Sequence, residues 1–176
     1  MKHDVFGIGS ALMDTLIEVN DQDLKDLRLK KGNMHLVDAV TVDFITTVMR
    51  TKKQIIQPGG SASNTIAGIS NLGGKTFFNG KIGKDALGNE YEKAMIKQGV
   101  NCDLKKIKDS TGNVVSLITK DCERTFATNL GSAVQFNKKD IAKKQLKNSK
   151  ILHLEGYMLE DPKLKAASLK AMKIAK

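Results

Sequence analysis

Alternation of strand-like and helix-like segments is the feature that most narrows the folds open to this 176-residue chain. A short apolar run at residues 3–9 is typical of a buried strand. Four further strand-like runs are each followed by a segment of helical periodicity, and they lie at residues 34–40, 54–60, 75–80 and 150–159. The alternation predicts an α/β fold, a mainly parallel sheet with helices on both faces.

Two stretches interrupt this alternation. Residues 15–19 (TLIEV) alternate with period two, and residues 111–129 hold two β-rich runs joined by a polar Lys-Asp-Cys-Glu turn, as in a hairpin. We expect both to be antiparallel additions that stand apart from the main sheet. No linker or internal repeat divides the chain, so the sequence predicts one domain over residues 1–176, with the added strands near 13–19 and 111–129.

Composition narrows the classes of partner. No apolar run approaches the length of a membrane span, and the N-terminus lacks the features of a signal peptide, so no membrane partner is expected. The two cysteines form no metal or redox spacing, which makes a reducing cytoplasm the default location. The three histidines are scattered singly, and no metal site is expected.

The net charge of +10 raises nucleic acid as a partner, but the lysines are interleaved with acids. The densest lysine run, residues 138–150, contains no aromatic side chain and is typical of a solvated helix face. We therefore expect no nucleic-acid partner.

Residues 58–74, PGGSASNTIAGISNLGG, place two adjacent glycines directly before a helix. Gly59 and Gly60 allow another group to approach the main chain closely, and the helix beyond them begins with unpaired N–H groups. Asp14 comes directly after a strand end, and in open parallel sheets ligands lie beyond the carboxyl ends of the strands. A carboxylate facing the glycines would suit two sugar hydroxyls, although capping of a turn explains Asp14 equally well. Asn64 either contacts a polyol or simply starts the helix.

The two standard nucleotide-binding motifs are incomplete in this chain. Gly7 and Gly9 begin a dinucleotide fingerprint, but Leu12 stands where its third glycine belongs. GISNLGGK at residues 68–75 misses the phosphate-loop spacing by one residue. Neither motif therefore predicts a nucleotide site.

The combination of Asp14, the Gly59-Gly60 pair, Asn64 and the hairpin resembles the ribokinase-like, or PfkB, family of carbohydrate and nucleoside kinases. The likeness extends from VFGIGSALMD to LHLEGYML and implies a ribokinase-like α/β fold with a small β lid. Residues 59–64, followed by glycines at positions 73 and 83, resemble the family's N-terminal signature. Ile66 departs from it, because the family usually has Ala, Ser or Thr there.

Four stretches resemble the adenosine-kinase-like branch, namely KGNMHLVD, GKIGKDALG, ERTFATNLG and LEGYML. By that resemblance Asp14 would hold ribose hydroxyls, while Gly59, Gly60 and Asn64 would line the same pocket. Ser10 stands where adenosine kinases commonly have Asn beside the ribose, which weakens the case for adenosine over another sugar.

The resemblance also implies roles for residues outside the glycine stretch. The hairpin would be part of a lid, with Phe126 as an apolar contact for the base or sugar. Arg124 would stabilise the transferring phosphoryl charge, unless it is a solvated hairpin arginine. Met158 would border the pocket, unless it belongs to the core.

ATP and Mg²⁺ are the implied cofactors. Family members bind them largely through a C-terminal segment with an Asn-x-x-Glu motif and a Gly-Ala-Gly-Asp motif, whose Asp is the general base. Gly-Ala-Gly-Asp does not occur in this chain, so no catalytic base is assigned here. We expect the N-terminal portion of a longer kinase, which holds the acceptor half of the active site and is inactive alone.

The resulting hypothesis is a kinase that transfers the ATP γ-phosphate to a hydroxymethyl group of adenosine or a related sugar. The alternatives are a ribokinase- or fructokinase-type sugar kinase, and a non-catalytic sugar- or nucleoside-binding module. The implied partners are a small sugar or nucleoside and a second copy of the chain, paired through the lid.

Overall fold

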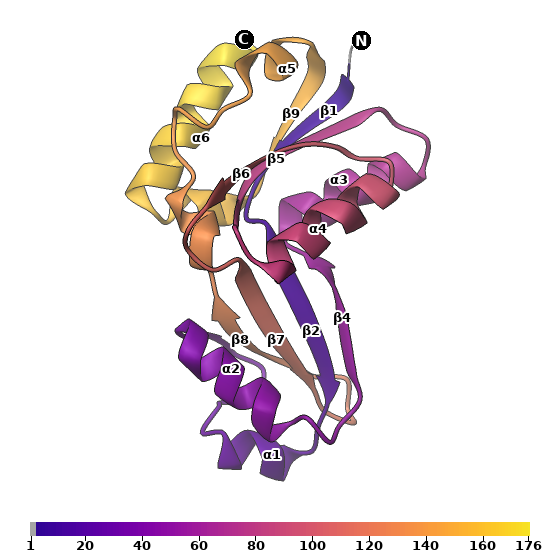
Figure 1. The fold of residues 1–176 in the computed structure, drawn as a ribbon, viewed down its shortest axis with the longest axis vertical. Helices are drawn as coiled ribbons and strands as arrows, with labels where there is room; N and C mark the ends of the chain where they lie inside the picture. The colour runs from indigo at the N-terminus through magenta and orange to yellow at the C-terminus, as the bar shows by residue number, and fades with distance from the viewer. Residues whose placement is uncertain (1–2) are drawn as a thin grey trace.

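A computed structural model describes residues 3–176 and contains two β-sheets in this range. The first sheet has the strand order β6-β5-β1-β9, and all its pairings are parallel. Its strands are β1 (His3–Ile8), β5 (Thr76–Gly83), β6 (Asn101–Ile107) and β9 (Ser149–Leu154). Both faces of this sheet are covered by helices, as the alternation predicts (Figure 1).

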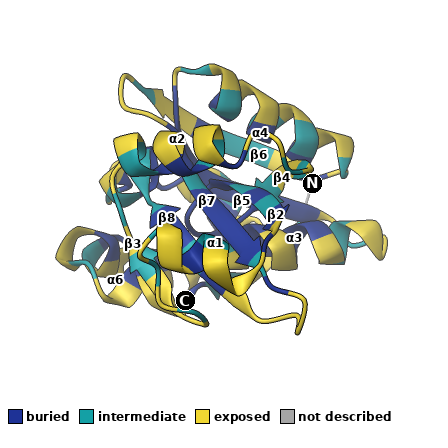
Figure 2. Cartoon of the chain, turned by 90° about the horizontal axis from the view of Figure 1, so that it is seen from below, coloured by how far each residue is buried: buried dark blue, intermediate teal, exposed yellow. Residues whose placement is uncertain are grey.

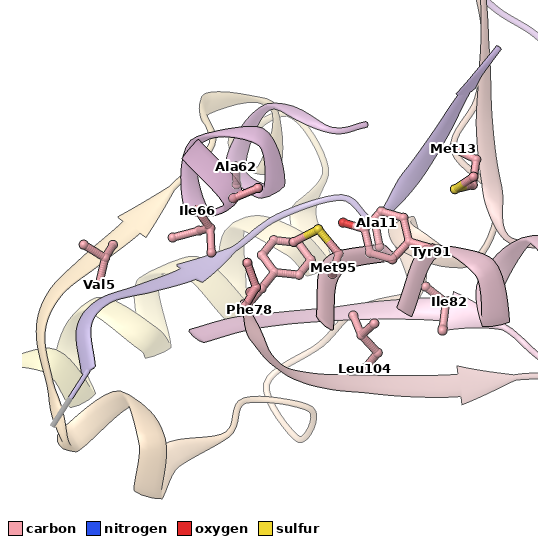
Figure 3. Close-up of a cluster of buried hydrophobic side chains, with 12 residues drawn as sticks. Val5, Ala11, Met13, Ala62, Ile66, Phe78, Ile82, Tyr91, Met95 and Leu104 are labelled. Atoms are coloured by element: carbon pink, nitrogen blue, oxygen red, sulfur yellow. The ribbon is translucent and has the colours of Figure 1, made fainter. Parts of the chain in front are cut away.

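One face of the first sheet packs against α3 (Ser61–Asn71) and α4 (Ala86–Lys97). Ile66 of α3 and Met95 of α4 converge with Phe78 of β5 in a buried cluster (Figure 3). The opposite face packs against α5 (Lys143–Lys147), α6 (Pro162–Ala175) and the short 3-10 turns η1 (Gly131–Gln135) and η2 (Gly156–Leu159). The first sheet is therefore a buried parallel sheet, typical of α/β proteins.

The second sheet has the strand order β3-β8-β7-β2-β4. Its strands are β2 (Leu12–Glu18), β3 (Met34–Leu36), β4 (Gln54–Gly59), β7 (Gly112–Ile118) and β8 (Arg124–Asn129). Two helices, α1 (Asp21–Asp26) and α2 (Ala39–Val48), pack on one face and form a third core cluster with it. The second sheet thus extends away from the first with helices on one side only (Figures 1 and 2).

The second sheet contains both expected additions, residues 13–19 and 111–129, but it is larger and more mixed than the sequence suggests. β3 and β4 belong to it as well, although their strand–helix context indicates the main sheet. The β2–β7 and β3–β8 pairs are parallel, while the β2–β4 and β7–β8 pairs are antiparallel.

Three elements differ from the expectation. β6 was not predicted from the sequence. Its residues NCDLKKI include lysines at exposed positions of an edge strand, and these hide the apolar pattern of a buried strand. The helix expected over 138–150 is only the five residues of α5, since residues 138–140 form a turn in which Asp140 accepts from the Asn137 N–H. The strand expected over 150–159 ends at Leu154, and the chain then turns into η2.

Asp85 fixes one of the passages between the two sheets. It caps α4 by accepting from the Gly88 N–H at 2.7 Å, and it also accepts from the Thr111 N–H at 2.7 Å and the Thr111 hydroxyl at 2.6 Å. Thr111 directly precedes β7, so the start of β7 in the second sheet is tied to the start of α4. None of the described helices combines the length and the apolar character that crossing a bilayer requires.

Candidate functional site

Asp14 and Gly59 come together on neighbouring strands of the second sheet. In the antiparallel β2–β4 pair Leu12 stands opposite Gly59, and Asp14 stands opposite Gln57. A Cβ atom on Gly59 would overlap the carboxylate of Asp14. Only glycine therefore leaves room for this carboxylate, and the bare main chain at position 59 has a steric cause.

The Asp14 carboxylate has no hydrogen-bond donor within reach among residues 3–176. Burial raises its pKa from the ordinary 3.8 to about 6, and the positive charge of Arg124 opposes this rise. A half-buried carboxylate without a partner is costly, because its lost hydration is not replaced. Its environment suits it to accept hydrogen bonds from the hydroxyls of a ligand.

Gly60 forms the turn between β4 and α3. Its φ of 95° lies in the region that favours glycine, and a Cβ there would overlap the carbonyl oxygen of Ser10. The Ser63 hydroxyl donates to the Gly59 carbonyl, and it lies 3.1 Å from the Gly60 carbonyl. The two glycines are thus held between the β1–β2 passage and the first turn of α3.

Glu155 is a site residue that the sequence reasoning missed. Its buried carboxylate accepts from the Ser10 N–H at 2.8 Å and from the Ala62 N–H at 3.1 Å. Glu155 thereby joins the end of β9 to the β1–β2 passage and to the N-terminus of α3, where a negative charge is favourable. An acidic residue within the otherwise apolar strand-like run at 150–159 is the signal that could have identified it.

Asn64 and Ser10 lie beside the two glycines but differ in exposure. Asn64 is exposed in the first turn of α3, and its main-chain N–H donates to the Gly60 carbonyl at 3.0 Å. Its side-chain amide makes no hydrogen bond within the described part of the chain. Ser10 is buried, and its N–H is already occupied by Glu155. Asn64 is the freer of the two for a ligand.

Phe126 and Arg124 lie on the same face of the second sheet as Asp14. The register pairs Asp14 with Val114 and Val114 with Thr128, so even-numbered residues of β8 share the face of Asp14. This face is opposite to α1 and α2, and we call it the open face. Its exposed or half-buried apolar side chains besides Phe126 are Leu16, Met34, Leu36, Ile55 and Ile118, while Leu12 and Val114 on the same face are buried with Ala133 of η1.

Met158 is not part of this arrangement. It is 1% exposed within the cluster under α5 and α6, and its sulfur lies 3.8 Å from the Ser168 hydroxyl. Met158 therefore matches the alternative stated for it, a core residue, because helical packing on the far face of the first sheet buries it.

Among residues 3–176 no three His, Cys, Asp or Glu side chains converge as a metal-binding group. The sequence does contain one Asn-x-x-Glu, at Asn89 and Glu92, but both side chains contact Lys106, at 2.9 and 2.7 Å. We assign ATP and Mg²⁺ no residue in this chain.

Comparison with known proteins gives consistent matches. The profile of the pfkB family carbohydrate kinase matches residues 32–176. Probable fructokinase-5 of Arabidopsis thaliana is 31% identical over 123 residues, which cover 68% of this chain and 38% of that protein. The 5-dehydro-2-deoxygluconokinase of Photobacterium profundum is also 31% identical over 123 residues, which cover 67% of this chain and 37% of that protein.

Solved structures of two kinases superpose on this chain over almost its whole length. A probable sugar kinase from Rhizobium etli superposes with a TM-score of 0.91 at 32% identity, covering 99% of this chain and 53% of that one. Adenosine kinase from Sinorhizobium meliloti gives the same score and identity, covering 99% of this chain and 54% of that one. These matches confirm the ribokinase-like α/β fold, and the chain spans about half the length of these structures. Since the family profile also covers most of its residues, the chain belongs to the pfkB family of carbohydrate kinases.

Proposed function

We propose that the protein carrying this chain transfers the γ-phosphate of ATP to a hydroxymethyl group of a nucleoside or sugar, with adenosine as the first candidate. The observation that supports this most is the unpartnered Asp14 carboxylate beside Gly59, at the base of the open face. This chain supplies the acceptor-binding half and the lid. When bound, ATP supplies the phosphoryl group and Mg²⁺ neutralises its charge, and we propose that most of the residues that bind them belong to a C-terminal part outside this chain.

The acceptor contacts follow from the position of each group. Asp14 accepts hydrogen bonds from two hydroxyls of the acceptor, and the main chain at Gly59 and Gly60 lies against the sugar. The exposed Asn64 amide donates and accepts at its edge, while Ser10, whose N–H is bound by Glu155, borders the pocket behind Gly60. The second sheet acts as the lid.

The open face favours an acceptor with an apolar part. Phe126 is half-buried between the glycine site and the exposed Met34 of β3, and a nucleobase would cover the apolar surface there better than a free sugar. Arg124, on the same face, is proposed to stabilise the phosphoryl charge. This supports a nucleoside acceptor.

A sugar acceptor is the second candidate. The curated relatives named above include a probable fructokinase, and Ser10 stands where adenosine kinases commonly have Asn. A non-catalytic binding module would share the acceptor contacts and transfer no phosphate.

We place the protein in the cytoplasm, where its two free cysteines stay reduced, and assign it no nucleic-acid partner.

ADP release by the full-length natural protein tests these alternatives. Adenosine, inosine, ribose and fructose are compared with ATP and Mg²⁺ present, using Asp14→Asn as the disabled variant and Asp43→Asn as a matched surface control. We expect adenosine to saturate at the lowest concentration, with loss of this response in Asp14→Asn alone. Saturation by fructose first would support the sugar kinase, and no ADP release with any acceptor would refute the kinase proposal.

A further inference from the structure

Gln57 is a polar residue of the open face to which the acceptor contacts above assign no role. In the unbroken antiparallel ladder of β2 and β4, Gln57 stands directly opposite Asp14. Residues that face each other in such a ladder project from the same face of the sheet, with Cβ atoms about 4.5–5.5 Å apart. Gly59, two positions further along β4, has the Asp14 carboxylate where its own side chain would be, as expected for the same face. Gln57 and Asp14 are therefore immediate neighbours.

The side-chain amide of Gln57 is available to a ligand. Gln57 is exposed, and its amide makes no hydrogen bond with any of residues 3–176. The next residue of β4 on the same face is Gly59, so no side chain of β4 separates the amide from the surface proposed to lie against the sugar. Pro58 restricts the residue before it to extended conformations, and the backbone of Gln57 is thus fixed before a ligand binds.

A hydroxyl group that binds Asp14 needs a second partner. When the hydroxyl donates to the carboxylate, its oxygen still has two lone pairs, and an ionised carboxylate has no donor to offer them. In a half-buried site an unmet acceptor is costly, because the water that it bound in solution is displaced. A glutamine amide has two N–H donors, and the ladder places Gln57 next to the carboxylate.

We propose that Gln57 is a specificity-determining residue of the acceptor site, and that its amide donates to the same hydroxyl oxygen that donates to Asp14. This inference rests on the proposed function, since it takes Asp14 as the hydroxyl-binding group. The two side chains together recognise a group that donates and accepts at once. A hydrogen in place of the hydroxyl loses both contacts, and a methoxy group keeps only the contact with Gln57. The site therefore selects sugars and nucleosides whose hydroxyl at this position is unmodified.

Calorimetric titration of the full-length natural protein with adenosine and with fructose tests the proposal. Gln57→Leu removes the amide and keeps a side chain of similar size, so we expect about three- to tenfold weaker binding, the effect of one hydrogen bond. The loss is expected with either ligand, because the contact is with a hydroxyl and not with a base. Gln22→Leu is the matched control, since Gln22 is an exposed glutamine of α1, which packs on the other face of the second sheet.

Asp14→Asn separates this inference from the proposed function. Unchanged affinity in Gln57→Leu, together with a loss in Asp14→Asn, overturns the role of Gln57 and leaves the acceptor site in place. Unchanged affinity in both variants, or no binding of either ligand by the wild type, refutes the acceptor site and the role of Gln57 together.

Analogues that lack one hydroxyl show whether Gln57 acts through a single contact. With 2′-deoxyadenosine and 3′-deoxyadenosine, we expect Gln57→Leu to match the wild type for the analogue that lacks the shared hydroxyl. For the other analogue the three- to tenfold loss should remain. An equal loss with adenosine and both analogues would overturn the proposal, because it would show a general disturbance of β4. Circular dichroism of each variant confirms that it remains folded.

Discussion

Replacement of Asp14 by Asn is expected to stabilise the ligand-free protein at neutral pH, although it removes a proposed binding group. The carboxylate is half-buried without a hydrogen-bond donor among residues 3–176, and burial raises its pKa to about 6. An amide of the same shape carries no charge, so it escapes the cost of ionisation in this environment.

The size of the effect follows from the pKa. At about 1.4 kcal/mol for each tenfold change in an ionisation constant, a rise from 3.8 to about 6 corresponds to about 3 kcal/mol. Because the carboxylate keeps some contact with solvent, we expect roughly half of this, about 1.5 kcal/mol, in the free energy of unfolding.

The direction of the pKa shift of Asp14 determines how the stability difference between the variant and the wild type depends on pH. The folded-state pKa lies above the unfolded value, so the favourable contribution of the protonated carboxyl is fully present below about pH 3.8 and is lost as the pH rises through about 6. Asp14→Asn should therefore exceed the wild type in stability at pH 7.5 and match it near pH 3.5. Urea unfolding at both pH values measures this, with Asp43→Asn as the exposed control. A variant less stable than the wild type at pH 7.5 would refute the reasoning.

Three further substitutions probe the same site. Gly59→Ala should displace the Asp14 carboxylate and weaken acceptor binding at least tenfold, measured by calorimetry, and unchanged affinity would contradict the steric argument. Glu155→Gln should lower the free energy of unfolding in urea by about 2 kcal/mol, because its amide NH₂ would face a main-chain N–H at Ser10 or Ala62. A loss below 0.5 kcal/mol, about the effect of an ordinary surface substitution, would count against the structural role of Glu155. Phe126→Ala should weaken binding of adenosine more than binding of ribose, and equal losses for both ligands would exclude a contact with the base.

The layered part of the fold was predictable, because it leaves local signals. Short stretches of sequence are enough to recognise helical periodicity, the Asp85 cap of α4 and the Gly59-Gly60 pair. The contact of Asp14 with Gly59 depends on the long-range pairing of β2 with β4, and Asp14 lies within β2 rather than after a strand end as the sequence suggested. The second sheet was predictable only in part. β4 has the same strand–helix context as a strand of the first sheet, and only its long-range pairing with β2 decides where it lies.

Glu155 and Met158 show the same limit at the level of single residues. The bond from Ser10 to Glu155 joins positions 145 residues apart, so no local pattern indicates it. Met158 is four residues beyond β9, but a short 3-10 turn directs it into the core under α6. Contacts that depend on how distant segments meet were the ones that sequence reasoning missed.

The place of β1 in its sheet has a consequence for synthesis on the ribosome. Among the strands of residues 3–176, β1 is synthesised first, yet it lies between β5 and β9, and its register pairs His3 with Ser149. During translation one edge of β1 can pair with β5 once residue 83 has left the exit tunnel, while the other edge waits for about seventy more residues at about 5–20 residues per second. The nascent chain therefore exposes one unpaired edge of β1 for several seconds. A chaperone that binds unfolded chains could bind this edge during that interval.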